Sequence, residues 1–233
     1  MRHFLLVHGG SHGSWCWQDL IAELQARGAS ASAMDLPGHG DDPTPRRSVN
    51  RQAYLRAVED RIDSIESSHL TLVGHSLAGI ILPELADRCG ERLQQVVFLA
   101  ALVCSPGQRA IDLIPENRRP SYFEQAETSH DFSVSWGYDK ARQLFFNDLS
   151  EDRAEWAYHQ LTPQPFQVYL DPVPTTVPRC PLRYLICQRD QCLPRESCLQ
   201  WAERLDVAPE EIDGGHDVML SQAAGLADQL LSG

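Results

Sequence analysis

This sequence of 233 residues lacks several features, and each absence excludes a class of protein. No apolar run approaches the roughly 20 residues that a membrane-spanning helix needs. The formal net charge is −12, so the basic face that nucleic-acid binding requires is not expected. The cysteines show no C-x-x-C spacing, which argues against a zinc site. We therefore expect a globular protein that binds no nucleic acid, no membrane and no metal.

The cysteines and the N-terminal residues indicate a compartment. Seven cysteines are an odd number, so a complete set of disulfides cannot form. The apolar segment 4–7 follows the first three residues directly, which leaves no space for a signal peptide. We predict a cytoplasmic protein with reduced thiols. The sequence does not determine the oligomeric state, and a homodimer stays open.

Short apolar segments alternate with longer segments of helical periodicity, a pattern typical of a parallel sheet with helices on both faces. The expected strands are 3–7, 30–35, 70–74, 95–101, 182–187 and 208–212, of which the second and the last are the least apolar. The expected helices are 16–27, 48–66, 77–89, 194–205 and 218–231. These units predict an α/β domain with a mostly parallel sheet of about six strands.

One long segment, residues 105–178, interrupts this alternation. It contains no strong strand pattern, is dense in aromatic residues and ends in a cluster of prolines. Because it is too long for a simple loop, we interpret it as a mostly helical cap inserted between core segments 1–104 and 179–233. Catalytic sites on such sheets lie where the insertion leaves the core, so we expect it to roof the site. The alternative is a set of packing helices without substrate contact.

The strongest chemical signal is the segment Gly74-His75-Ser76-Leu77-Ala78. It follows an apolar strand and precedes a helical pattern, which is where a nucleophilic serine is exposed on a sharp turn. Glycine is usual two residues after such a serine, and this chain has alanine there. We predict that one methyl group is tolerated and that Ser76 is the nucleophile.

A second glycine-rich segment follows the first expected strand and begins with His8. Acyl transfer places negative charge on a carbonyl oxygen, which needs N–H donors held in position. We expect these donors to be the backbone N–H groups of Gly10 and Leu77. We interpret His8 as structural, with hydrogen bonds inside its own loop.

A serine hydroxyl needs a base, and the expected chain order is serine, then acid, then histidine. His216 lies between the last expected strand and the last helix, where it can reach Ser76. Asp190 follows the penultimate strand and is predicted to orient the imidazole. Asp213 and Asp217 are close to His216 in sequence, and we interpret both as surface carboxylates.

Several segments together resemble the methylesterase and hydroxynitrile lyase branch of the α/β-hydrolases. They are HGGSHGSWCW (8–17), DLPGHG (35–40), GHSLAG (74–79), DQCLP (190–194) and GHDVMLS (215–221). The resemblance covers both ends of the core but not residues 105–178. It implies an α/β-hydrolase fold and an esterase for small esters with an apolar or aromatic acid part.

The resemblance also implies an alternative activity, that of a hydroxynitrile lyase. Hydroxynitrile lyases of this branch carry threonine at the position of Gly9 and lysine at the position of Asp217, so the sequence favours a hydrolase. A small-molecule ester is the expected partner, and no cofactor is needed. Thioester, lactone, amide or carbon–carbon bond hydrolysis stays open, as does a ligand-binding receptor with slow turnover.

Overall fold

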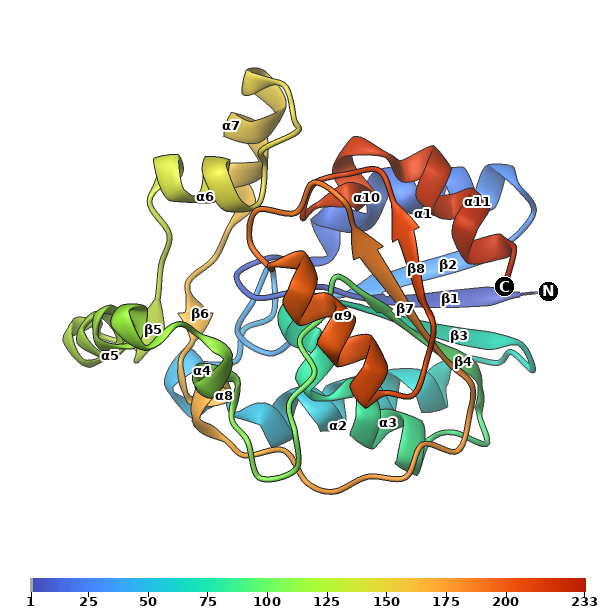
Figure 1. The fold of residues 1–233 in the computed structure, drawn as a ribbon, viewed down its shortest axis with the longest axis horizontal. Coiled ribbons are helices and arrows are strands. Elements are labelled where there is room, and N and C mark those ends of the chain that lie inside the picture. Colours follow the sequence, from blue (N-terminus) through green and yellow to red (C-terminus); the bar gives the residue numbers. More distant parts are fainter. Residues whose placement is uncertain (1) are drawn as a thin grey trace.

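Six parallel strands form the central sheet of the protein, whose residues 2–233 are described by a computed structural model (Figure 1). Their order is β2-β1-β3-β4-β7-β8, and every neighbouring pair is parallel. The strands are β1 (His3–Val7), β2 (Ser30–Met34), β3 (Leu70–His75), β4 (Leu93–Leu99), β7 (Leu182–Cys187) and β8 (Pro209–Ile212). The predicted sheet is confirmed, although β4 begins and ends two residues before its expected bounds.

The composition of each strand follows from its place in the sheet. The central strands β1 and β3 have neighbours on both edges and helices on both faces, so Phe4 to Val7 are fully buried. The edge strands β2 and β8 are partly exposed, and their sequences are less apolar. A continuous apolar run is therefore found only where both faces of a strand are covered.

Helices cover both faces of the sheet (Figure 1). On one face lie α1 (Gln18–Ala26), α10 (Val218–Ser221) and α11 (Ala223–Leu231). On the other face lie α2 (Arg51–Ser64), α3 (Leu82–Arg88) and α9 (Arg195–Arg204). The Asn50 side chain accepts a hydrogen bond from the Ala53 N–H at 2.9 Å and so fixes the start of α2, three residues after the predicted start.

The predicted helix 77–89 is wrong in one respect, because two elements replace it. A 3₁₀ segment, η3 (Ser76–Ile80), comes first, and α3 begins only at Leu82. Pro83 lies in the first turn of α3, where its missing N–H costs nothing. The chain therefore changes direction after the serine before a regular helix can start.

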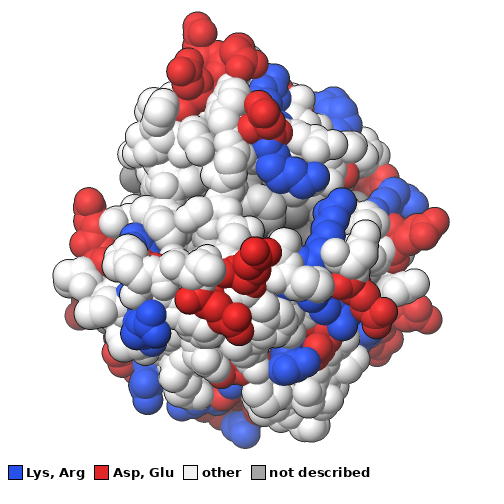
Figure 2. Space-filling view, turned by 90° about the vertical axis from the view of Figure 1, so that its left-hand side faces the viewer, with Lys and Arg blue, Asp and Glu red and all other residues white. Residues whose placement is uncertain are grey.

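The helices of the segment 105–178 lie beyond the end of the sheet toward which the strands run (Figure 1). The segment contains α4 (Ala110–Leu113), η4 (Glu116–Arg118), α5 (Arg119–Thr128), α6 (Tyr138–Leu144), α7 (Glu151–Gln160) and α8 (Gln167–Leu170). Two short antiparallel strands, β5 (Ser133–Val134) and β6 (Gln164–Pro165), join its parts. Figure 2 shows this side of the molecule, which has a broad uncharged area with acidic and basic side chains at its borders.

Two further observations concern the predicted compartment. Across residues 2–233, no helix combines the length and the apolar character needed to cross a membrane. The seven cysteines all lie in this part of the chain and are free thiols.

A close backbone approach holds the turn that follows β3. The Leu102 N–H donates to the Ser76 carbonyl at 3.0 Å. A Cβ on Gly79 would lie 2.1 Å from the Leu102 carbonyl oxygen and 2.8 Å from its nitrogen. Because both atoms belong to the backbone, they cannot move aside as a flexible side chain would.

We expect Gly79→Ala to lower the free energy of unfolding by about 1–3 kcal/mol, as overpacking does. Gly225→Ala is the matched control, since a Cβ on Gly225 meets nothing within 4 Å in helix α11. Alanine there should raise stability by about 0.5–1 kcal/mol, because glycine disfavours helices. Urea titrations of both variants measure the two effects, and equal midpoints would contradict the proposed backbone clash.

Candidate active site

The structure brings Ser76, His216 and Asp190 together from three separate segments. Ser76 follows β3 directly, Asp190 follows β7, and His216 follows β8. The Ser76 hydroxyl donates to His216 Nε2 at 3.0 Å, and His216 Nδ1 donates to Asp190 Oδ2 at 2.7 Å. An alcohol, an imidazole and a carboxylate in this chain of hydrogen bonds can transfer a proton from the alcohol to the imidazole.

Ser76 has a backbone φ of 52°, a left-handed conformation that non-glycine residues rarely adopt. Such strain persists only where the surrounding structure enforces it, and it is typical of a nucleophile on a strand-to-helix turn. A Cβ on Gly9 would lie 2.8 Å from the Ser76 Cβ, so glycine is needed there. Ala78, at the position where glycine was expected, is buried without disturbing the turn.

The carboxylate of Asp190 is held in a fixed orientation. Its Oδ1 accepts hydrogen bonds from the backbone N–H groups of Cys192 and Leu193, at 2.7 and 2.9 Å. Its Oδ2 is thereby directed at His216. Burial of His216 disfavours its charged form, but the negative charge of Asp190 outweighs burial and raises the pKa of His216 well above 6.5.

Gly10 and Leu77, the expected oxyanion donors, lie side by side at the same cavity as Ser76. A Cβ on Gly10 would be 3.2 Å from Leu77 Cδ2. Throughout residues 2–233, the Gly10 N–H donates to no protein acceptor, so it is free to bind a ligand oxygen. The pair can supply two N–H groups to one developing oxyanion.

His8 has the structural role that the sequence predicts. Its Nδ1 donates to the Gly9 carbonyl at 2.7 Å, and its Nε2 accepts from the Leu36 N–H at 2.9 Å. Complete burial lowers the pKa of His8 to about 4, so the ring is neutral at pH 7. His8 therefore joins the glycine-rich loop after β1 to the loop after β2.

Gln164 is a positioning residue that the sequence analysis missed. Its Oε1 accepts from the Ser11 N–H at 3.0 Å, next to Gly10, and its Nε2 donates to the Tyr54 hydroxyl at 3.0 Å. The side chain is almost fully buried and connects the insertion to the glycine-rich loop. Nothing local marks this residue, because Ser11 and Gln164 are 153 positions apart.

Asn147 and Asp148, also in the insertion, hold the loops that carry the acid and the base. The Asp148 carboxylate accepts from the Gly215 N–H at 2.6 Å, directly before His216. The Asn147 amide donates to the Arg189 carbonyl at 3.0 Å, directly before Asp190. The insertion therefore fixes the spacing between these two loops as well as covering them.

Asp217 corrects the sequence analysis, which placed it on the surface. It is fully buried, and its Oδ2 lies 2.7 Å from His12 Nε2, whereas Asp213 is exposed as predicted. The hydrogen bond to the buried His12 holds the Asp217 side chain inside the protein. Burial favours the neutral carboxyl, but His12 outweighs burial and the pKa of Asp217 is lowered.

Two hydrogen-bond acceptors hold the His12 ring between the glycine-rich loop and Asp217. Its Nδ1 lies 2.7 Å from the Gly10 carbonyl and its Nε2 lies 2.7 Å from the Asp217 carboxylate. His12 and Asp217 therefore form a buried hydrogen-bonded pair beside the loop that carries Gly10.

Among the described residues 2–233, one trio could in principle bind a metal ion. Ligand atoms of His75, His216 and Asp217 lie within 4.8 Å of one another. Both nitrogens of His216 are already hydrogen-bonded, to Ser76 and to Asp190. A metal would therefore break the contacts that define the site, and the expectation of no metal stays a prediction.

A cavity of about 670 Å³ opens over Ser76. This volume lies in the range of pockets for small organic ligands. Gly10, Leu77 and His216 line it together with Ser76, and five aromatic residues contribute to its wall. The aromatic residues are Tyr122, Trp136, Phe145, Tyr169 and Trp201.

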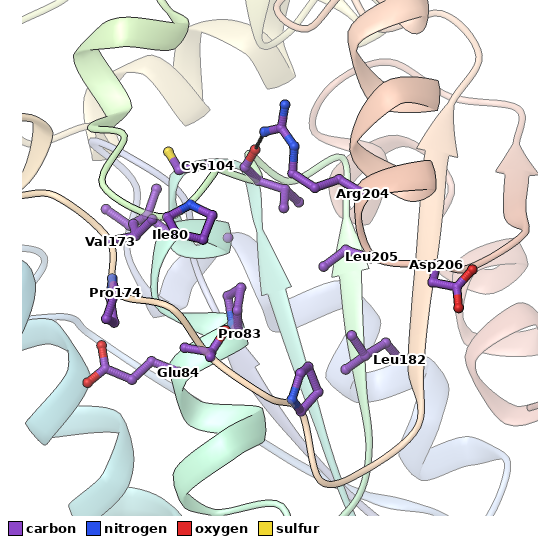
Figure 3. A pocket seen from close by; sticks show the side chains of 15 residues that line it. Ile80, Pro83, Glu84, Cys104, Val173, Pro174, Leu182, Arg204, Leu205 and Asp206 are labelled. Carbon is purple, nitrogen blue, oxygen red and sulfur yellow. Dashed lines mark hydrogen bonds between the residues drawn. The ribbon is translucent and has the colours of Figure 1, made fainter.

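A second cavity, of about 230 Å³, is lined in part by residues of η3 and of the segment that follows β4 (Figure 3). Gly79, Ile80, Val103 and Cys104 contribute to its lining. Its lining includes the Cys104 thiol, whose pKa is raised to about 12 by burial. A thiol that stays protonated at pH 7 has little nucleophilicity, so Cys104 is not expected to act as a nucleophile.

Comparisons with known proteins agree with this geometry. Residues 4–229 match the model of the alpha/beta hydrolase family. The chain is 33% identical over 132 residues to a probable esterase, PIR7A, of Oryza sativa, which covers 54% of this chain and 50% of the rice protein. It is 28% identical over 181 residues to a carbendazim hydrolyzing esterase of a Nocardioides species, covering 74% of this chain and 73% of that protein.

An extracellular alpha/beta-hydrolase from a Paenibacillus species has the same fold, with a TM-score of 0.87 and 21% identity over 100% of this chain and 98% of that chain. The predicted α/β-hydrolase fold and the resemblance to esterases of this kind are confirmed. The chain spans about half the length of the rice relative.

We expect Asp217→Asn to lower the free energy of unfolding by about 3–5 kcal/mol at pH 7, because it removes the carboxylate from the buried pair with His12. The lowered pKa of Asp217 means that its contribution exists above pH 3.8 and is lost as the pH falls through the folded-state pKa. The difference from wild type should therefore shrink under acid conditions. Denaturant titrations at pH 7 and at low pH measure it.

Asp213→Asn is the control for this substitution. It removes an exposed carboxylate that pairs with Arg189, four residues before Asp217. A surface pair of this kind contributes about 0–1 kcal/mol. Equal losses in the two variants would show that the buried pair has no special role.

Proposed function

Because the chain belongs to the alpha/beta hydrolase family, we propose that it is a serine esterase acting on a small apolar or aromatic carboxylic ester. The observation that carries the proposal is the chain of hydrogen bonds from Ser76 through His216 to Asp190, with distances of 3.0 and 2.7 Å. The serine lies at a cavity with an aromatic wall, which suits an apolar acyl or alkyl group.

In the first step, Ser76 Oγ attacks the ester carbonyl carbon while His216 Nε2 accepts the hydroxyl proton. Negative charge moves to the carbonyl oxygen, where the N–H groups of Gly10 and Leu77 stabilise it. Asp190 stabilises the imidazolium that forms. Collapse of the tetrahedral intermediate breaks the bond to the alkoxy group, which leaves as alcohol after taking the proton from His216.

The second half of the reaction, hydrolysis of the acyl-enzyme, restores the free enzyme. The acyl group is then bonded to Ser76, and His216 is neutral again. A water molecule gives a proton to His216 and attacks the acyl carbonyl carbon. The second tetrahedral intermediate expels Ser76, which recovers its proton from His216, and the carboxylic acid leaves. Every proton moves between Ser76, His216, water and the leaving group, so this reaction needs no cofactor.

The surroundings of Asp217 support a hydrolase rather than a hydroxynitrile lyase. In those lyases the residue after the catalytic histidine is a lysine, which would stabilise departing cyanide. Here that position holds an aspartate whose carboxylate binds His12 and does not line the cavity.

On the cysteine composition alone, we also propose the cytoplasm as the compartment.

Ser76→Ala should lower kcat for p-nitrophenyl esters about 10⁶-fold if the three residues act as a unit. Asp190→Asn should lower it about 10⁴-fold, because the imidazole then adopts the wrong tautomer. Ser221→Ala is a matched control, since its hydroxyl is buried without a hydrogen-bond partner among the described residues. Near-wild-type turnover by Ser76→Ala would exclude the proposed nucleophile.

The pH dependence gives an independent test. His216 must be neutral to act as a base, and its pKa is raised above 6.5 by Asp190. We therefore expect kcat/KM to rise with pH through an acid limb whose apparent pKa exceeds 6.5. In Asp190→Asn this limb should move to lower pH. A limb that stays unchanged in the variant would mean that Asp190 does not set the pKa of the base.

A further inference from the structure

The charges that line the catalytic cavity differ in sign from those of the whole chain. The sequence has 32 acidic and 20 basic residues, yet in the described structure no Asp or Glu lines the cavity. The charged side chains that do line it are two cations, Arg118 and Lys140. Lys140 is the only lysine in the sequence. A lining drawn at random from this chain would more often be acidic.

Neither cation is neutralised by the protein. Within residues 2–233, Arg118 and Lys140 form no ion pair, and the Lys140 ammonium donates only to the Gln143 amide oxygen at 3.1 Å. Other arginines of the insertion do form pairs, such as Arg142 with Glu151 and Arg153 with Asp19. The two cavity cations are therefore available to a ligand.

The two cations come from different segments and are more exposed than the catalytic histidine. Arg118 ends η4 and is exposed, and Lys140 lies in the first turn of α6 and is half-buried. His216, which lines the same cavity, is almost fully buried. The cations therefore belong to the outer part of the cavity.

A row of aromatic rings leads from the base to these cations. His216 contacts Phe145 with ring centroids 5.7 Å apart, Phe145 contacts Trp136 at 5.0 Å, and Trp136 contacts Tyr122 at 6.1 Å. Tyr122 is four positions after Arg118 in the same helical segment, and Trp136 is four positions before Lys140. A ligand along this wall meets apolar surface first and positive charge at the end.

We propose that the substrate of this cavity is an ester whose apolar or aromatic body carries a carboxylate at the end remote from the scissile bond. The inference rests on the proposed esterase function and names its substrate class. The net charge of −12 repels anions at long range, so local cations are needed for such a ligand to bind. Arginine suits this role, because its guanidinium can bind a carboxylate through two hydrogen bonds.

The test compares pairs of p-nitrophenyl esters of one chain length, one with a terminal carboxylate and the other with a terminal carboxamide. Across several lengths, we expect kcat/KM to favour the carboxylate by about tenfold at the best length. The preference should fall as ionic strength rises, because salt screens exposed charges. A ratio of one or below at every length would overturn the inference.

Variants locate the effect. In Lys140→Gln and Arg118→Gln, the ratio of kcat/KM for the two esters should fall toward one. Arg56→Gln is the matched control, since it removes one positive charge from an exposed position of α2 outside the cavity lining. Its ratio should equal that of wild type. An unchanged ratio in the double variant Arg118→Gln, Lys140→Gln would also overturn the inference.

A binding measurement separates this inference from the proposed function. Calorimetry with Ser76→Ala compares a dicarboxylic acid with its monoamide and needs no turnover. Tighter binding of the dicarboxylic acid, lost in Ser76→Ala combined with Lys140→Gln, supports the inference even if wild type hydrolyses neither ester. Equal binding of the two ligands rejects it even if wild type is an active esterase.

Discussion

The left-handed backbone of Ser76 is the constraint on which the rest of the site depends. A residue at φ 52° is held there only when its surroundings exclude other conformations. The Leu102 N–H fixes the Ser76 carbonyl, and Gly9 and Gly79 leave room for the turn. The segments that directly follow the buried strands β1, β3 and β4 supply these contacts, so the hydrophobic core stabilises a conformation that the serine alone would avoid.

The insertion acts on the site in two physical ways. Its aromatic side chains form the wall of the cavity. Its polar side chains, Gln164, Asn147 and Asp148, hydrogen-bond to the backbone of the three loops that carry the oxyanion donor, the acid and the base. Substrate binding and the geometry of the reacting groups therefore depend on the same segment. A change in the insertion can alter turnover without touching the substrate.

The sequence predicted what is encoded locally. Ser76, Asp190 and His216 each follow an apolar strand, and parallel strands end at one edge of the sheet, so their meeting could be expected. The pairing of His12 with Asp217 joins residues 205 positions apart, and nothing near Asp217 distinguishes it from the exposed Asp213. The break between η3 and α3 was missed for the opposite reason, because residues 77–89 have a good helical pattern that the strained turn overrides.

The two buried carboxylates of the site share one arrangement. Asp190 and Asp217 each bind an imidazole, and in both cases the imidazole lines the cavity while the carboxylate does not. His216 and His12 therefore separate negative charge from the place where an oxyanion forms. A carboxylate facing the cavity would repel that oxyanion, whereas an imidazole in front of it can accept a proton or carry positive charge. This arrangement explains how an acidic protein can present a catalytic cavity without a single acidic side chain among its described lining residues.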